Sequence, residues 1–122
     1  MYSPIVLAIL SNKYNFHYTY LGTGCIFEYE GDIHPFGLES NGFTESDVPN
    51  FFGSGYSVVK GYTDRLMYLF PNVLNVRIRM PITVDLNPRN FITKITTYKK
   101  VCSVPNSMTI LPELLPLMID MG

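Results

Sequence analysis

The sequence lacks the features that mark several common functional classes. Its 122 residues include only two cysteines and two histidines, too few and too scattered for a disulfide framework or a zinc site. The net charge of -1 leaves no basic stripe for nucleic acid. The apolar run at residues 5–10 is too short to span a bilayer and lacks the flanks of a signal peptide. We therefore expect a cytoplasmic protein with reduced thiols that binds neither nucleic acid nor membrane.

A glycine-rich turn for a dinucleotide pyrophosphate is also lacking. Gly22-Thr23-Gly24 begins such a motif, but Phe27 stands where a third glycine is needed and no helix pattern follows. The composition that is present, 47% hydrophobic and 16% charged, is that of a globular chain. At this length it can bury one modest core, so one domain or part of one is expected.

The hydrophobic pattern predicts helices and strands in alternation. We expect the last turns of a helix over residues 4–10, a strand over 16–21, and a long Gly- and Pro-rich excursion over 22–49 that holds a short strand at 25–29. Ser54 is placed to cap a helix that runs to about residue 70 with Val58, Val59, Tyr62, Leu66 and Leu69 at helical spacing. A strand over 73–80 that Pro81 ends, a helix over 90–98, an extended stretch over 101–104 and a helix opened by Pro112 follow. This order favours an α/β fold with a parallel sheet flanked by helices.

Tyr56 and Lys60 form a Tyr-x-x-x-Lys pair in the first turns of the predicted central helix. Residues four apart on a helix share one face, so an ammonium would lie beside a phenol there, an arrangement that suits proton donation to an alkoxide. The alternative is a surface pair on an amphipathic helix, because so short a motif also arises by chance. The motif counts only in the context of the strand and loop upstream of it.

Thr23 and Cys25 follow the first predicted strand. The end of a strand in an open parallel sheet is where ligands bind, so the Thr23 hydroxyl could hold a substrate carbonyl; the alternative is a plain tight turn. A thiolate at Cys25 could remove a proton made acidic by an adjacent ketone. The alternative is a cysteine buried as a small hydrophobe.

Several longer blocks carry a resemblance to a known family. The blocks are Gly22-Thr23-Gly24-Cys25-Ile26-Phe27-Glu28-Tyr29, Pro49-Asn50-Phe51, Tyr56-x-x-x-Lys60, Arg77-x-Arg79-Met80-Pro81-Ile82, Pro88-Arg89-Asn90-Phe91-Ile92-Thr93-Lys94-Ile95 and Pro105-Asn106-Ser107-Met108-Thr109. In this order they resemble the bifunctional nucleotide-rhamnose synthase 3,5-epimerase/4-reductases, which are extended short-chain dehydrogenase/reductases of the dTDP-4-dehydrorhamnose reductase type.

The resemblance implies conversion of UDP- or dTDP-4-keto-6-deoxyglucose to the L-rhamnose nucleotide, by 3,5-epimerisation and then 4-keto reduction with NADPH or NADH. Thr23, Tyr56 and Lys60 match the reductase triad, and Tyr56 and Lys60 would also bind the cofactor. Cys25 matches the epimerase base and Lys94 the acid on the opposite face of the sugar. For Lys94 the alternative is an exposed helix lysine.

The chain also departs from the family pattern. Gly55 precedes the tyrosine where relatives carry a bulky aromatic residue, and no amino-terminal dinucleotide-binding βαβ unit is present. We therefore expect residues 1–122 to be a single partial domain, the catalytic half of a Rossmann-like parallel sheet and an internal fragment, inactive alone. Expected partners are the nucleotide-sugar substrate and either a second copy in a homodimer or a chain supplying the missing half. The alternative is a non-catalytic remnant that acts through oligomerisation. The choice between UDP and dTDP, and between NADPH and NADH, stays open.

Overall fold

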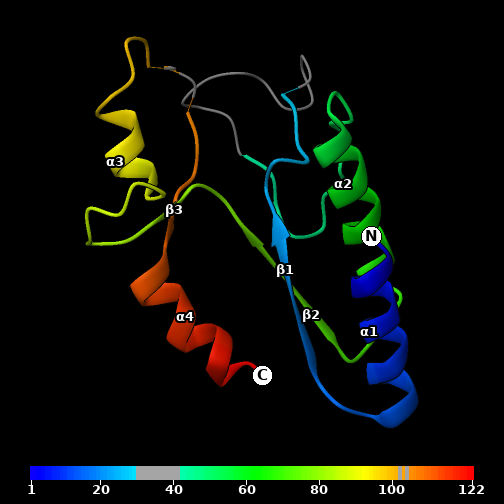
Figure 1. The fold of residues 1–122 in the computed structure, drawn as a ribbon. Coiled ribbons are helices and arrows are strands. Elements are labelled where there is room, and N and C mark those ends of the chain that lie inside the picture. The colour runs from blue at the N-terminus through cyan, green and yellow to red at the C-terminus, as the bar shows by residue number, and fades with distance from the viewer. Residues whose placement is uncertain (30–41, 102, 104) are drawn as a thin grey trace.

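The computed structural model describes residues 1–29, 42–101, 103 and 105–122 (Figure 1). Cys102 and part of the predicted stretch over 101–104 lie outside them. The elements are α1 (Tyr2–Tyr14), β1 (Tyr18–Thr23), α2 (Gly55–Met67), β2 (Val73–Ile78), β3 (Pro81–Ile82), α3 (Phe91–Ile95), β4 (Thr109–Ile110) and α4 (Leu111–Asp120). The prediction of an α/β fold is confirmed.

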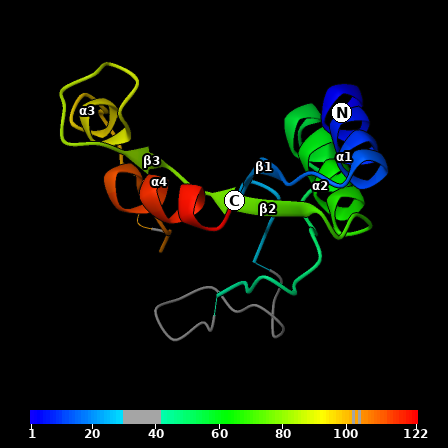
Figure 2. The same ribbon diagram turned by 90° about the horizontal axis from the view of Figure 1, so that it is seen from below.

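Strands β1 and β2 form a parallel pair, and α2 is the connection between them. Tyr18 lies opposite Val73 and Thr23 opposite Ile78, so both strands end at the same edge. Helices α1 and α2 lie side by side on one side of this pair, while α3 and α4 lie on the other (Figures 1 and 2). The residues that follow β1 and β2 are therefore neighbours, as the hydrogen bond from the Gly24 N–H to the Ile78 carbonyl (2.9 Å) shows.

The core lies between α1, α2 and β1. Ala8, Tyr20 and Met67 are its buried members, and Ile5, Tyr18, Leu66, Phe70 and Val73 pack against them. Burial raises the pKa of Tyr18 above its usual value, and the neighbouring Tyr20 adds to this while Lys60 opposes it. These contacts fix α2 on β1, which carries the candidate site at its end.

Helix α1 is longer than the predicted 4–10. Asn15 ends it in the left-handed conformation (φ 52°) with its N–H on the Ser11 carbonyl, a termination for which asparagine is well suited. The polar residues before it form the last helical turn.

Helix α2 begins where predicted, because the Ser54 side chain accepts a hydrogen bond from the Ser57 N–H at 3.0 Å. It ends at Met67, short of residue 70, and of its predicted apolar residues Leu66 packs against the core. Val59, Tyr62 and Leu69 are exposed, whereas the buried residues are Ser57, Gly61, Thr63, Asp64 and Met67. Gly61 allows the Phe52 ring to approach, since a Cβ there would lie 3.2 Å from it, and Asp64 has a buried partner described below. The apolar spacing therefore identified the helix but only part of its inward face.

Replacing Ser54 by Ala is expected to lower the free energy of unfolding by about 1 kcal/mol, because the cap of α2 is lost. The Ser54 hydroxyl also donates to the Ser57 Oγ at 2.9 Å, so the same change loosens Ser57. Urea denaturation would measure the effect against Ser3→Ala, an exposed serine in α1. Equal stability of the two variants would contradict the capping role.

Other predicted elements differ from the structure after β1 and after β2. Residues 25–29 form a turn and irregular chain rather than a strand. Strand β2 ends at Ile78, and Pro81 begins β3 instead of ending a strand, because Met80 turns the chain with a positive φ of 41°. Helix α3 is shorter than the predicted 90–98. The predicted single sheet is also wrong: β3 pairs with β4 in a second parallel pair, with Pro81 opposite Thr109.

Candidate functional site

Thr23 and Cys25 lie at the carboxyl end of β1, as predicted. Thr23 is 7% exposed, and its Oγ1 accepts a hydrogen bond from the Cys25 N–H at 3.2 Å. Because a hydroxyl has one proton to donate as well, Thr23 can still donate to a carbonyl oxygen. The Cys25 thiol is partly buried and forms no disulfide. Both side chains therefore belong to one turn at the sheet edge.

Ser57, the residue after Tyr56, fixes the first turn of α2 to the chain at Cys25. The Ser57 hydroxyl donates to the Cys25 carbonyl at 2.8 Å, across 32 positions of sequence. Tyr56 is 55% exposed, and no hydrogen bond among the described residues involves its phenol. The phenol is thus free to meet a bound molecule while its backbone is held beside Cys25.

Lys60 lies one turn further along α2 and reaches β1. Its Nζ donates to the Tyr20 hydroxyl at 3.1 Å and to the Leu21 carbonyl at 3.4 Å, and it lies 5.0 Å from the Tyr20 ring centroid. The structure therefore gathers Thr23, Cys25, Tyr56 and Lys60 around the β1 end and α2. Ser57 and Tyr20, which hold them there, were not identified from the sequence because their contacts are long-range.

Lys94 is the candidate that the structure does not bring into contact with the others. It is exposed on α3, and no hydrogen bond among the described residues joins its ammonium to another candidate. Figures 1 and 2 place α3 across the β1–β2 pair from α2. Its role stays a prediction.

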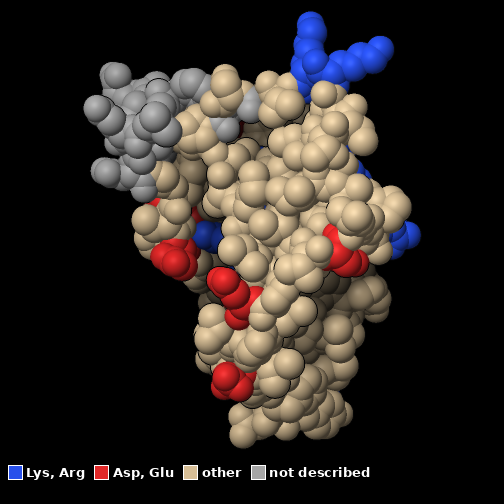
Figure 3. All heavy atoms as spheres, turned by 90° about the vertical axis from the view of Figure 1, so that its left-hand side faces the viewer, with Lys and Arg blue, Asp and Glu red and all other residues tan. Residues whose placement is uncertain are grey.

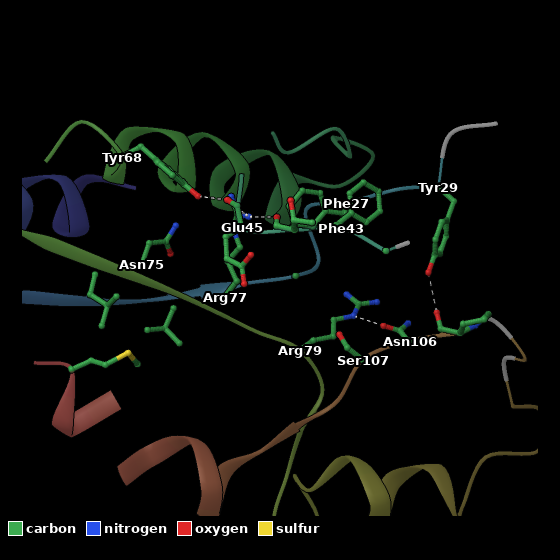
Figure 4. A pocket seen from close by; sticks show the side chains of 17 residues that line it. Phe27, Tyr29, Phe43, Glu45, Tyr68, Asn75, Arg77, Arg79, Asn106 and Ser107 are labelled. Atoms are coloured by element: carbon green, nitrogen blue, oxygen red, sulfur yellow. Dashed lines mark hydrogen bonds between the residues drawn. The ribbon is translucent and has the colours of Figure 1, made fainter. Parts of the chain in front are cut away.

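A cavity of about 810 Å³ lies beside the end of β1 (Figure 4). Phe27 and Phe43 stack in its wall with ring centroids 4.5 Å apart, and Arg79 and Asn106 face them from the other side. Gly24 also lines it, whereas Thr23, Cys25, Tyr56 and Lys60 do not. The cavity therefore adjoins the four gathered residues rather than containing them, and it offers an aromatic and cationic surface next to them.

Arg77 holds one wall of this cavity. Its guanidinium forms two 2.8 Å hydrogen bonds with Asp64, whose side chain is 2% exposed, and it donates to the carbonyls of Thr44, Glu45 and Asp47. The hydrogen bonds that Arg77 donates to Asp64 raise the pKa of Arg77, and burial opposes this. Arg77 therefore stays charged and serves as a structural anchor for residues 44–47.

Arg79 contacts Cys25, although no pattern in the sequence predicts a role for it. Its Nη1 lies 2.6 Å from the Cys25 Sγ, and its Nε donates to the Asn106 Oδ1 at 2.9 Å. Arg79 follows β2 as Cys25 follows β1, and parallel strands end at the same edge of a sheet, so their order in the chain could have indicated that the two residues are neighbours.

Other kinds of site are not indicated by the part of the chain that is described. No three His, Cys, Asp or Glu side chains there cluster as metal ligands would, and no helix there is long and apolar enough to cross a bilayer. The face that carries α3 and α4 shows scattered acidic side chains and broad uncharged areas (Figure 3).

Comparisons with known proteins find similar sequences and a similar structure among the nucleotide-rhamnose synthases. No protein-family profile matches the chain. Protein L780 of Acanthamoeba polyphaga mimivirus is 62% identical over 123 residues, which are 100% of this chain and 42% of that protein. The crystal structure of the L780 UDP-rhamnose synthase matches 99% of this chain and 42% of its own, with a TM-score of 0.87. The bifunctional dTDP-4-dehydrorhamnose 3,5-epimerase/dTDP-4-dehydrorhamnose reductase of Arabidopsis thaliana is 57% identical over 101 residues, 82% of this chain and 33% of that protein.

The chain is thus homologous to a segment of the nucleotide-rhamnose synthases and shares the fold of that segment. It spans less than half the length of these relatives.

Proposed function

We propose that this chain carries the catalytic residues of a nucleotide-rhamnose 3,5-epimerase/4-reductase, acting on UDP- or dTDP-4-keto-6-deoxyglucose. The observation that carries the proposal is the hydrogen bond from Ser57 to the Cys25 carbonyl, because it holds the start of α2 against the end of β1. That contact holds the helical turn of Tyr56 beside Cys25, and Cys25 is bonded to Thr23, which supports joint action of the three residues on one sugar ring. The 62% identity to a UDP-rhamnose synthase supports the substrate class.

In the reductive step we assign Tyr56 and Thr23 to the ketone oxygen. The Thr23 hydroxyl donates a hydrogen bond to that oxygen, and the Tyr56 phenol gives it a proton as negative charge develops. Lys60 supports the phenol electrostatically from one turn along α2. The hydride for this reduction comes from the reduced nicotinamide when the cofactor is bound.

The residues that would hold the cofactor fit that role. An ammonium has three N–H donors, and the contacts of Lys60 to Tyr20 and Leu21 use two of them, so one is left for a ribose hydroxyl. The Tyr56 phenol, which forms no hydrogen bond with a described residue, would lie beside the same ribose. We propose NADPH or NADH on this basis, in a partial Rossmann-like fold.

In the epimerising step we assign Cys25 and Lys94. The Cys25 thiolate takes a proton from a carbon next to the ketone, so an S–H bond forms and the electron pair passes into an enolate. The Lys94 ammonium then gives a proton to the opposite face of that carbon and becomes a neutral amine, and solvent restores both groups. The position of α3 across the strand pair from α2 supports an acid that acts from the opposite side.

A chimera tests the proposal. The 123 matched residues of the mimivirus protein would be replaced by this chain. The remainder of the mimivirus protein would then surround the candidate site. With NADPH or NADH, the chimera is expected to convert UDP- or dTDP-4-keto-6-deoxyglucose to the L-rhamnose nucleotide. Chromatography of the product and the absorbance of the reduced cofactor would measure this conversion.

The matched control is the same chimera with Cys25→Ala, which should lose 3,5-epimerisation but still reduce a 4-keto sugar that is already epimerised. A folded chimera that shows neither reaction, while the unmodified mimivirus protein shows both in the same assay, would refute the proposed function.

A further inference from the structure

We infer that Arg79 is a positioning residue for the Cys25 base: its guanidinium holds the sulfur in place and stabilises it as a thiolate. The inference rests on the proposed function, which makes Cys25 the group that removes the carbon-bound proton. Nothing in the sequence patterns assigned Arg79 this role, because the two residues lie 54 positions apart.

The first support is the contact itself. The Arg79 Nη1 is a fixed cation 2.6 Å from the Cys25 Sγ. A cationic donor next to a thiol stabilises negative charge on the sulfur, and the thiolate is the form that acts as a base. Cys25 is then held at its N–H by Thr23, at its carbonyl by Ser57 and at its sulfur by Arg79.

The second support is that Arg79 is itself held at three atoms. Its backbone N–H donates to the Thr109 Oγ1 at 2.9 Å, its carbonyl accepts from the Thr109 N–H at 2.8 Å, and its Nε donates to Asn106. The first two contacts fix the backbone from which the side chain extends and the third restrains the guanidinium, so Arg79 loses less freedom when it pairs with the sulfur. The guanidinium is therefore preorganised at the sheet edge.

The third support comes from a comparison with Arg77, two residues earlier. The charge of Arg77 is taken up by Asp64, whereas Arg79 has no carboxylate partner among the described residues. The two arginines thus differ in whether a carboxylate neutralises their charge, although they lie two residues apart. The charge of Arg79 is available for the sulfur.

Gly24 makes room for this arrangement. A Cβ at Gly24 would lie 3.3 Å from the Arg79 Cδ and 3.6 Å from its Cβ, so the absent side chain lets Arg79 cross the end of β1 and reach the next residue. Both Gly24 and Arg79 also line the cavity, so it borders the residue before Cys25 and the guanidinium that contacts the Cys25 sulfur.

Alkylation of the full 122-residue chain by iodoacetamide tests the inference without any need for activity. Peptide mass spectrometry reports Cys25 and Cys102 separately, so Cys102 is the internal reference. Arg79→Gln is expected to slow alkylation of Cys25 about tenfold, because the thiolate is the nucleophile. Arg79→Lys should recover part of the rate by restoring the charge, and Arg89→Gln, which removes an exposed arginine, should leave it unchanged.

Two further arms keep the test decisive. If Arg79→Gln does not fold, Asn106→Ala removes the Nε partner from an exposed position and should still slow alkylation, by a smaller factor. In the chimera, Arg79→Gln should reduce deuterium uptake from D₂O at C3 and C5 far more than reduction of a pre-epimerised substrate.

The inference would be overturned if Cys25 in folded Arg79→Gln were alkylated at the wild-type rate. If only Asn106→Ala folds, the same result in that variant would overturn it. An inactive wild-type chimera would instead refute the proposed function, and the alkylation rates would still report whether Arg79 stabilises the thiolate.

Discussion

Replacing Tyr56 by Phe in the chimera is expected to reduce the rate of 4-keto reduction by about 10²–10⁴-fold, the usual contribution of a positioned proton donor. The substitution removes one oxygen and keeps the ring, so the start of α2, which Ser54 and Ser57 hold, should not change. Single-turnover oxidation of NADPH with a pre-epimerised 4-keto sugar would isolate this step from epimerisation.

The chain offers a matched control on the same helix. Tyr62 is 57% exposed in α2, and its ring packs near Phe52 with centroids 5.5 Å apart, a contact that phenylalanine keeps. Tyr62→Phe should therefore reduce the sugar at the wild-type rate. If Tyr56→Phe and Tyr62→Phe gave the same rate, Tyr56 would not be the proton donor.

The largest effect on stability is expected at Asp64. Its side chain is 2% exposed and accepts hydrogen bonds from both Arg77 and Asn75, so Asp64→Ala leaves a guanidinium that is only 13% exposed without its counter-charge. Breaking such a pair from one side costs about 3–5 kcal/mol, a large part of the 5–15 kcal/mol that stabilises a typical domain. Urea denaturation followed by circular dichroism would measure the change.

Two variants show whether the loss comes from the uncompensated charge. Asp120→Ala removes an exposed carboxylate from α4 and should leave stability within about 0.5 kcal/mol of the wild type. The double change Asp64→Ala with Arg77→Met removes both charges and should recover part of the loss, because an apolar pair often replaces a buried ion pair at little cost. A double variant less stable than Asp64→Ala would contradict this explanation.

Those elements of the fold that are set by local chemistry were predictable from the sequence. Ser54 marked the start of α2 because a side-chain cap needs only residues within the next turn. Strand β1 was recognised from its β-branched and aromatic residues, which fit a pleated surface. Strands β3 and β4 were not predicted because each has two residues, too few to show an alternation of apolar and polar side chains.

Most of the inward face of α2 could not be predicted, because it depends on a residue from another element. Asp64 would ordinarily face solvent, and only Arg77 of β2, 13 positions later, makes its burial favourable. The same limit applies to the candidate site. Thr23, Tyr56 and Lys60 were found through a local motif and a strand end, whereas the contact of Arg79 with Cys25 depends on how β1 and β2 pair.

The attachment of Arg79 to Thr109 and Asn106 has a consequence for how the protein matures. During synthesis the chain emerges from its amino terminus, so Cys25 and Arg79 leave the ribosome well before the residues that tether the guanidinium. A nascent chain thus carries its sulfur without a fixed cation beside it. The guanidinium is fixed beside the thiol only once Asn106 and Thr109 have docked at the end of β2.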